Sequence, residues 1–163
     1  KQGNPLESST TTAPMARVDL AEKLHGQLIT TAKQGGKLLT GGSVEGANFQ
    51  PALLVDVPEN SPAFNEETFG PMAAVVRVRD AEDAIELANK TRYGLGASVW
   101  TRDTEMAERI AWRINAGAVF VNGLVKSTPQ LPFGGIKKSG YGRELSYFGM
   151  KEFMNAKTVY IYD

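Results

Sequence analysis

Apolar residues recur at three- and four-residue intervals along much of the chain, and this spacing predicts amphipathic helices. The longest helix is expected over residues 14–34, where it ends at a Gly-Gly pair. A second helix follows Asp80, and a third is capped by Asp103 or Thr104, because a short polar side chain can accept the free backbone N–H groups of a first turn. A short helix is expected near residues 145–154.

Short apolar runs bounded by glycine, proline or asparagine predict strands between these helices. Residues 72–78 are almost continuously apolar, which is typical of a strand buried on both faces. The order strand, helix, strand, helix, strand is that of βαβ units, so we predict an α/β fold built on part of an open, mostly parallel sheet with flanking helices. The last strand stands alone, and it either pairs with another chain or packs back on its own sheet. The predicted strands cover residues 37–40, 50–57, 72–78, 97–101, 118–121 and 158–162.

The balance of charge argues against nucleic-acid and membrane partners. Eighteen basic residues face eighteen acidic ones, so the formal net charge is zero and no broad positive field is expected. The apolar runs are too short to span a bilayer. With 163 residues, of which 42% are hydrophobic, the chain is large enough for one globular domain or a piece of a larger one.

The chain contains no cysteine. This excludes a disulfide framework, a thiolate nucleophile and a cysteine zinc site within these residues, and we predict a cytoplasmic location and no metal. Residues 1–13 are polar and predict an irregular lead-in. The chain opens without Met, so we expect it to be a segment of a longer protein.

Generic phosphate-binding and catalytic motifs are incomplete. The segment that begins at Gly140 starts like a dinucleotide fingerprint, but Leu145 occupies the last glycine position and no strand precedes it. In the preceding basic segment, Lys137 stands where a phosphate-binding loop needs glycine. The single histidine, His25, falls within the first predicted helix without a matching nucleophile, so we expect it to be structural.

Two segments remain unusual. Residues 65–71 place Glu66, Glu67 and Phe69 on a Gly-Pro turn directly before an apolar strand. Residues 132–144 carry four glycines through a basic loop. Taken singly, the first is equally well a turn with a solvated acidic pair, and the second a flexible surface loop.

Together and in this order, these segments resemble the C-terminal part of the aldehyde dehydrogenase superfamily, with greatest similarity to the bacterial NAD(P)-dependent succinate-semialdehyde dehydrogenases. The resemblance runs over nearly the whole chain. The motifs that carry it are Lys33-Gln34-Gly35-Gly36-Lys37-Leu38-Leu39 followed by Gly41-Gly42, Glu66-Glu67-Thr68-Phe69-Gly70-Pro71, Ala88-Asn89 with Tyr93-Gly94-Leu95, Gly117 through Val121-Asn122, and Pro132-Phe133-Gly134-Gly135 through Lys138-Ser139-Gly140 to Gly142-Arg143-Glu144.

The resemblance implies that the full protein oxidises an aldehyde to a carboxylic acid and reduces NAD or NADP. It implies that residues 14–150 are the C-terminal part of a catalytic domain, and that residues 151–163 are an oligomerisation segment of a homodimer or homotetramer. In the family a cysteine thiolate attacks the aldehyde, and that cysteine precedes the matching stretch. We therefore expect this chain alone to be inactive.

The resemblance also assigns site residues. Glu67 matches the glutamate that accepts hydrogen bonds from the nicotinamide ribose, and Phe69 matches the ring that packs beside the nicotinamide. Phe133 matches the aromatic wall of the aldehyde tunnel. Ser127 and Lys126 fall in the variable loop that meets the far end of the substrate, where Ser127 can donate a hydrogen bond to a distal carboxylate and Lys126 either adds positive charge or is simply solvated.

Two alternatives stay open. The chain can be a stand-alone α/β interaction module that uses its last strand to bind a partner and performs no chemistry. It can also belong to a dehydrogenase for another aldehyde, such as a long aliphatic or a betaine-type aldehyde. The second alternative shares the mechanism and differs only in the substrate.

Overall fold

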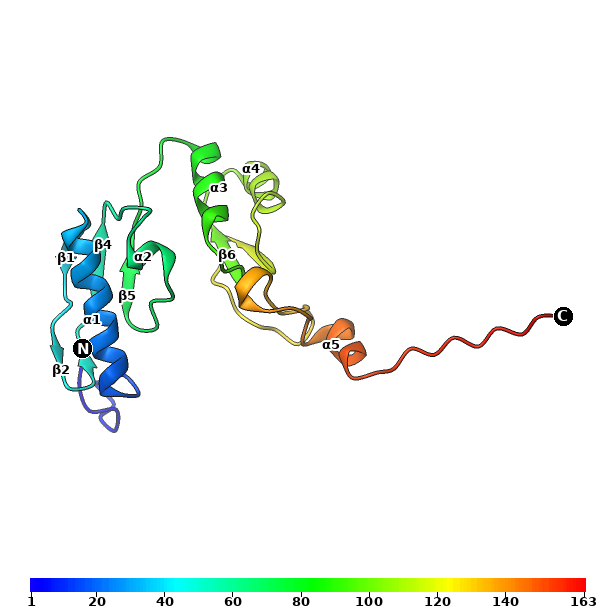
Figure 1. Ribbon diagram of the computed structural model, residues 1–163, viewed down its shortest axis with the longest axis horizontal. Coiled ribbons are helices and arrows are strands. Elements are labelled where there is room, and N and C mark those ends of the chain that lie inside the picture. Colours follow the sequence, from blue (N-terminus) through cyan, green and yellow to red (C-terminus); the bar gives the residue numbers. More distant parts are fainter. The chain divides into compact units, whose positions relative to one another are not determined.

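The computed structural model describes residues 1–163, which form two compact units, Lys1–Val78 (unit 1) and Arg79–Asp163 (unit 2). The boundary between the units falls within residues 14–150, the range predicted to be the C-terminal part of one catalytic domain. Helices and strands occur in both units (Figure 1), so the predicted α/β class is confirmed.

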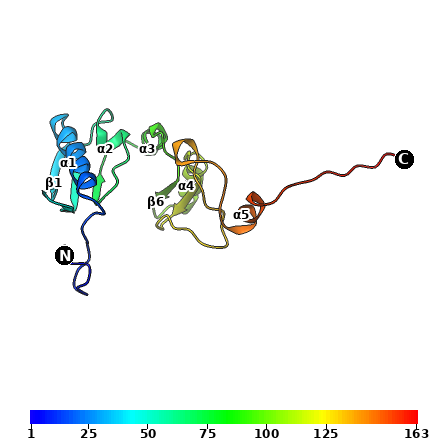
Figure 2. The ribbon, with the colours of Figure 1, turned by 60° about the horizontal axis from the view of Figure 1, so that its bottom comes forward.

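In unit 1 a long helix lies against a three-stranded sheet, as both ribbon views show (Figures 1 and 2). The strand order is β1-β4-β5, with β1 and β4 antiparallel and β4 and β5 parallel, and β2 and β3 form a small antiparallel hairpin. The elements are α1 (Val18–Lys33), β1 (Lys37–Thr40), β2 (Val44–Glu45), β3 (Asn48–Phe49), β4 (Ala52–Val55), α2 (Pro62–Asn65) and β5 (Met72–Ala74).

The core of unit 1 follows from the helical spacing of α1. Ala21, Leu24 and Leu28 lie three and four residues apart, so they share one face of the helix. That face is buried against Phe49 of β3 and Leu54 of β4. The apolar spacing therefore predicted the helix, and these three residues form its buried side.

Helix α1 begins at Val18, four residues later than predicted. Arg17 has an extended backbone, and the backbone N–H of Met15 donates to the carbonyl of Ala47 in the turn between β2 and β3, at 2.8 Å. The residues before Val18 are thus held by the hairpin turn, a contact that helical periodicity does not register.

The prediction that residues 72–78 form a strand buried on both faces is wrong. β5 spans only Met72–Ala74, and Ala73, Ala74 and Val75 are exposed. The physical reason is that β5 is an edge strand, because β4 is its only partner in the sheet. No element of unit 1 covers Ala73 and Ala74 of this strand.

In unit 2, strands β6 and β7 pair in parallel, and helix α4 lies between them in the sequence, as expected of a βαβ unit. Of the two caps that the sequence allowed for α4, Asp103 is the one observed, and its side chain accepts from the backbone N–H of Met106 at 2.8 Å. The elements are α3 (Ala81–Lys90), β6 (Gly96–Val99), α4 (Thr104–Ala111), β7 (Ala118–Val121), the 3-10 helix η1 (Lys137–Ser139) and α5 (Ser146–Glu152).

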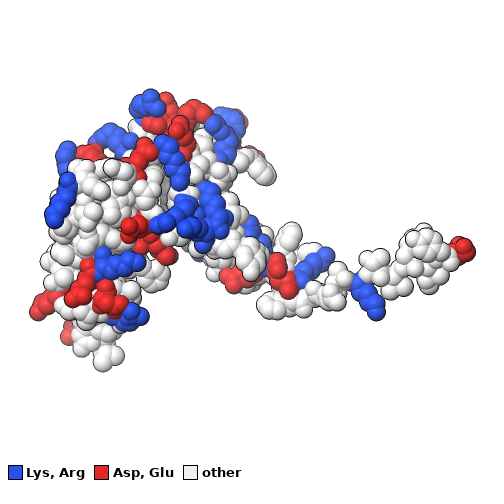
Figure 3. Space-filling model, viewed as in Figure 1, with Lys and Arg blue, Asp and Glu red and all other residues white.

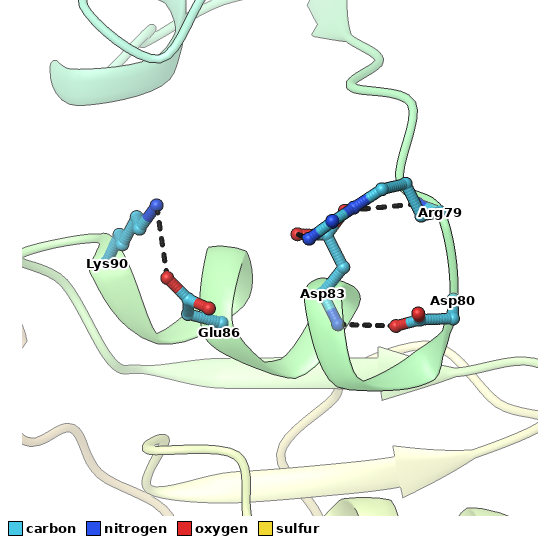
Figure 4. Close-up of polar contacts among 5 residues, drawn as sticks. All are labelled: Arg79, Asp80, Asp83, Glu86 and Lys90. Carbon is cyan, nitrogen blue, oxygen red and sulfur yellow. Dashed lines mark hydrogen bonds and ion pairs between the residues drawn. The ribbon is translucent and has the colours of Figure 1, made fainter.

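Helix α3 has the capping residue that the sequence predicts. The side chain of Asp80 accepts from the backbone N–H of Asp83 at 2.9 Å (Figure 4). Asp83 also pairs with Arg79 at 3.1 Å, and Glu86 pairs with Lys90 one turn further along at 3.5 Å (Figure 4). These local contacts stabilise the helix at both ends.

The segment after α5 runs extended and exposed to the C-terminus of unit 2 (Figures 1 and 2). It is largely uncharged in Figure 3, and residues 158–162 pair with no strand. The alternative that this segment packs back on its own sheet is therefore wrong for this chain, and pairing with another chain stays a prediction. None of the helices combines the length and the apolar character of a membrane span. The cytoplasmic location stays a prediction.

Candidate functional site

The loop that carries Glu67 and Phe69 joins α2 to β5 in unit 1. Ser61 and Pro62 start the one-turn helix α2, and the Ser61 hydroxyl donates to the carbonyl of Pro58 at 2.6 Å. The helix ends at Asn65, and residues 66–71 connect it to β5. The Gly-Pro pair of the sequence motif lies at the end of this loop.

A buried glutamine on α1 holds the loop. The side-chain Nε2 of Gln27 donates to Glu66 Oε2 at 2.8 Å and to the backbone carbonyl of Glu67 at 3.3 Å. Only 6% of Gln27 is exposed. The sequence analysis did not identify Gln27, although a polar residue inside the apolar stripe of a helix is a signal that could have found it, because buried polar groups need partners.

The loop lies tightly against α1 at Gly70. A Cβ atom built on Gly70 would be 2.5 Å from Leu24 Cδ2 and 2.9 Å from Met15 Cε, so no larger residue fits without displacing the loop or these side chains. Gly70 therefore lets the loop approach the side chains of Leu24 and Met15 closely.

The side chains of Glu67 and Phe69 line one hollow. The hollow has a volume of about 350 Å³ and is lined by Met15, Ala16 and Leu20 together with residues 67–70. Glu67 is exposed and its carboxylate makes no hydrogen bond or ion pair within the chain, while 72% of Phe69 is exposed. The structure thus brings an available carboxylate and an available aromatic ring to the same concave surface.

The loop that carries Lys126, Ser127 and Phe133 lies in unit 2, after β7. Lys126 and Phe133 line one hollow of about 360 Å³ with Phe120, Thr128 and Leu131 among the other lining residues. Ser127 is exposed and is not one of the lining residues. The structure therefore brings two of the three predicted substrate residues together and leaves Ser127 outside the hollow.

Phe133 itself is fixed by the chain around it. Its backbone N–H donates to the carbonyl of Glu144 at 2.9 Å, and the N–H of Glu144 donates back to Phe133 at 2.8 Å. Arg143 ties the same region, because its Nη1 donates to the carbonyl of Gly135 at 3.0 Å. The ring is half-buried.

The glycine-rich loop is held by backbone contacts. A Cβ atom on Gly117 would lie 1.7 Å from the carbonyl oxygen of Gly134, so the loop crosses the start of β7 where only glycine leaves room. The carbonyl of Gly94 accepts from the N–H groups of both Gly117 and Ile136, each at 3.0 Å, and the Ser139 hydroxyl accepts from Gly94 N–H at 3.0 Å. These motif residues shape the loop, and we assign them no chemistry.

Ion pairs on α3 lower the pKa of two carboxyl groups. The hydrogen bond from Arg79 is the main cause that lowers the pKa of Asp83, and the hydrogen bond from Arg113 is the main cause that lowers the pKa of Glu82. Neither group belongs to the two loops described above. No group of three or more His, Asp or Glu side chains is arranged to hold a metal ion.

The relatives of this chain include proteins of known activity. It is 45% identical over 163 residues to the NAD(P)+ succinate semialdehyde dehydrogenase Sad of Escherichia coli K12, a match that covers 98% of this chain and 35% of that protein. A solved succinic semialdehyde dehydrogenase of Streptococcus pyogenes, in complex with NADP+, matches with a TM-score of 0.94 and 36% identity, over 100% of this chain and 36% of that one. A betaine aldehyde dehydrogenase of Staphylococcus aureus in complex with NAD+ matches with a TM-score of 0.89 and 29% identity, over 94% of this chain and 32% of that one.

The chain spans about a third of the length of these relatives. The model of the aldehyde dehydrogenase family matches residues 1–159, which include both loops described above. This match and the resemblance of the motifs agree. The chain therefore belongs to the aldehyde dehydrogenase family.

Proposed function

We propose that this chain is part of an enzyme that oxidises succinate semialdehyde to succinate and reduces NAD or NADP. The observation that carries the proposal is the hollow in unit 1, where the Glu67 carboxylate and the Phe69 ring face a common space without partners of their own. The named activities of the relatives from Escherichia coli and Streptococcus pyogenes support the substrate and the cofactor.

The residues of the hollow fit a nicotinamide cofactor. A carboxylate has two oxygens that accept hydrogen bonds, so Glu67 can hold both adjacent hydroxyls of a ribose. The ring of Phe69 offers an apolar face that limits where a nicotinamide can swing, and about 350 Å³ lies within the range of small-molecule sites. When bound, the cofactor supplies the hydride acceptor; the part of Glu67 and Phe69 is to orient it.

The residues of the hollow in unit 2 fit the substrate. Phe133 forms an aromatic wall, and Lys126 brings a positive charge to the same space, where a distal carboxylate of the aldehyde would be attracted. Ser127, which lies outside the hollow, is the second candidate to donate to that carboxylate. A cationic or uncharged aldehyde gains nothing from Lys126, so this lysine favours succinate semialdehyde over a betaine-type substrate.

The nucleophile is not among these residues, because the chain has no cysteine. We propose that the cysteine and the general base are supplied by sequence outside these 163 residues, in keeping with the share of the relatives that the chain spans. The work of this chain is then to orient the cofactor and to shape the substrate site.

The test replaces Lys126→Met and Ser127→Ala in the intact enzyme, with Lys138→Met as the matched control. Lys138 is also an exposed lysine of unit 2, and its Nζ makes no hydrogen bond or ion pair within the chain. Because a charge-assisted hydrogen bond contributes about 1.5–3 kcal/mol, Lys126→Met is expected to lower kcat/KM for succinate semialdehyde by about tenfold or more. Ser127→Ala is expected to lower it less, and Lys138→Met to leave it unchanged.

The comparison substrate is an uncharged aldehyde of the same chain length. Its kcat/KM should stay close to that of the parent enzyme in both variants. Equal losses for the charged and the uncharged aldehyde would remove the carboxylate anchor and favour a different physiological aldehyde. An intact protein that reduces no NAD(P)+ with any aldehyde would favour the interaction module.

We also propose that residues 151–163 join copies of the enzyme into a homodimer or homotetramer. Val159, Tyr160, Ile161 and Tyr162 are each at least 73% exposed in this chain, although their residue types are those that strands bury. An extended apolar segment with unpaired backbone groups is suited to adding a strand to another sheet.

A further inference from the structure

Three polar residues of unit 1 are buried, and the side chains of all three bond to atoms of residues 58–67. Gln27 and Thr31 lie one turn apart on the apolar stripe of α1, and Ser61 starts α2; they are 6%, 0% and 0% exposed. Thr31 Oγ1 accepts from the backbone N–H of Ala63 at 3.1 Å, and Gln27 donates to the residues that follow α2. Burying a polar group is costly unless the group is hydrogen-bonded. The two buried polar side chains of α1 meet this requirement by bonding to this segment.

Gln27 acts at the end of the segment that carries the proposed cofactor residue. Its two hydrogen bonds fix the Glu66 carboxylate and the Glu67 carbonyl, while the Glu67 carboxylate stays available. Gly70 lies against Leu24 three residues further on, so the loop is fixed on both sides of Phe69. An apolar side chain at position 27 would fill the same space in the stripe, but it would leave the Glu67 backbone without this anchor.

We infer that Gln27 is a positioning residue that holds the Glu67 backbone so that the Glu67 carboxylate meets the ribose hydroxyls of the cofactor. The inference rests on the proposed function of Glu67. Gln27 does not touch the cofactor; it acts through residues 66 and 67. Loss of the anchor lets the carboxylate shift, and a displacement of about an ångström at a reacting or orienting group costs on the order of a hundredfold in rate.

The first experiment compares Gln27→Met with Gln2→Met in the intact enzyme. Gln2 is a matched control, because its Nε2 also donates to a distant backbone carbonyl of unit 1, that of Phe49, at 3.1 Å. Gln27→Met is expected to raise KM for NAD(P)+ and to slow single-turnover hydride transfer by about tenfold or more, with little change in KM for the aldehyde. Gln2→Met should leave all three parameters at their parent values.

A double-mutant cycle with Glu67→Gln separates positioning from general stability. If Gln27 acts through Glu67, the effects of Gln27→Met and Glu67→Gln on KM for NAD(P)+ are less than additive, because the second change removes a group that is already misplaced. Additive effects would show that Gln27 acts elsewhere and would overturn the inference. Equal behaviour of Gln27→Met and Gln2→Met would overturn it too.

A second variant covers the case in which Gln27→Met does not fold. Glu66→Ala changes an exposed residue and removes only the 2.8 Å bond, so it should fold and raise KM for NAD(P)+ by a smaller factor. An unchanged KM in Glu66→Ala would then count against the inference. The two proposals fail separately: a Glu67→Gln enzyme with parent kinetics overturns the role of Glu67, whereas an impaired Glu67→Gln enzyme beside a normal Gln27→Met enzyme overturns only the role of Gln27.

Discussion

The closest backbone approach among the motif glycines offers a sharp test of how the loop is held. Gly117→Ala would place a Cβ atom 1.7 Å from the carbonyl oxygen of Gly134 and 2.8 Å from its carbonyl carbon. Real Cβ contacts are not shorter than 3.0 Å, so the Gly134 backbone must move by about 1.3 Å. Both partners are backbone atoms, and neither can rotate away as a side chain would.

The expected cost has two parts. Overpacking in a well-packed site costs about 1–3 kcal/mol, which should appear as a lower Tm of the intact enzyme. Phe133 directly precedes Gly134, so a shift of about an ångström also moves the proposed substrate wall and should lower kcat/KM for the aldehyde by up to about a hundredfold. KM for NAD(P)+ should change little, because neither Gly117 nor Gly134 lines the hollow that contains Glu67.

Gly123→Ala is the matched control. A Cβ atom on Gly123 would meet only the Val121 carbonyl oxygen at 3.8 Å, an ordinary contact. Differential scanning calorimetry and steady-state kinetics on both variants provide the comparison. If Gly117→Ala has the Tm and kcat/KM of Gly123→Ala, the loop does not depend on this crossing and the reasoning is refuted.

Two further predictions concern charge and assembly. Because Arg79 lowers the folded-state pKa of Asp83, this pair contributes stability above the unfolded pKa of 3.8 and loses it as the pH falls through the lower folded value. Asp83→Asn should therefore lower Tm slightly at pH 7 and not at all well below pH 3.8, and a Tm difference that persists in acid would contradict the pairing. Deletion of residues 155–163 from the intact enzyme should lower the number of copies per particle, because the extended segment is proposed to join copies. Light scattering measures this number, and an unchanged number would rule this role out.

The helices were predictable where their causes are local. Asp80 and Asp103 cap α3 and α4 as expected, because a cap needs only a side chain and an N–H group three residues later. The start of α1 was not predictable, since it depends on the contact between Met15 and Ala47, thirty-two residues apart. The predicted burial of residues 72–78 was wrong for a similar reason, because apolar composition does not say which elements cover a strand.

The candidate residues could be named from the sequence, their arrangement only in part, and their role in a site stays a prediction. Glu67 and Phe69 were named from the motif, and they share a hollow; Lys126 and Phe133 also share one. Ser127, the neighbour of Lys126, lies outside that hollow, since adjacent loop residues point in different directions and the sequence does not say which turns inward. Gln27 was missed because its partners lie thirty-nine and forty residues further along the chain.

By itself the sequence determined the α/β class, the helical faces and the family, because periodicity, caps and ordered motifs depend on neighbouring residues. The tertiary structure decided which groups are held and which are available. The side chain of Gln27 is hydrogen-bonded within the chain, whereas the Glu67 carboxylate is exposed and able to accept a ligand. That difference arises from packing between segments distant in the chain, where burial forces a polar group to find a partner and exposure leaves it able to bind one.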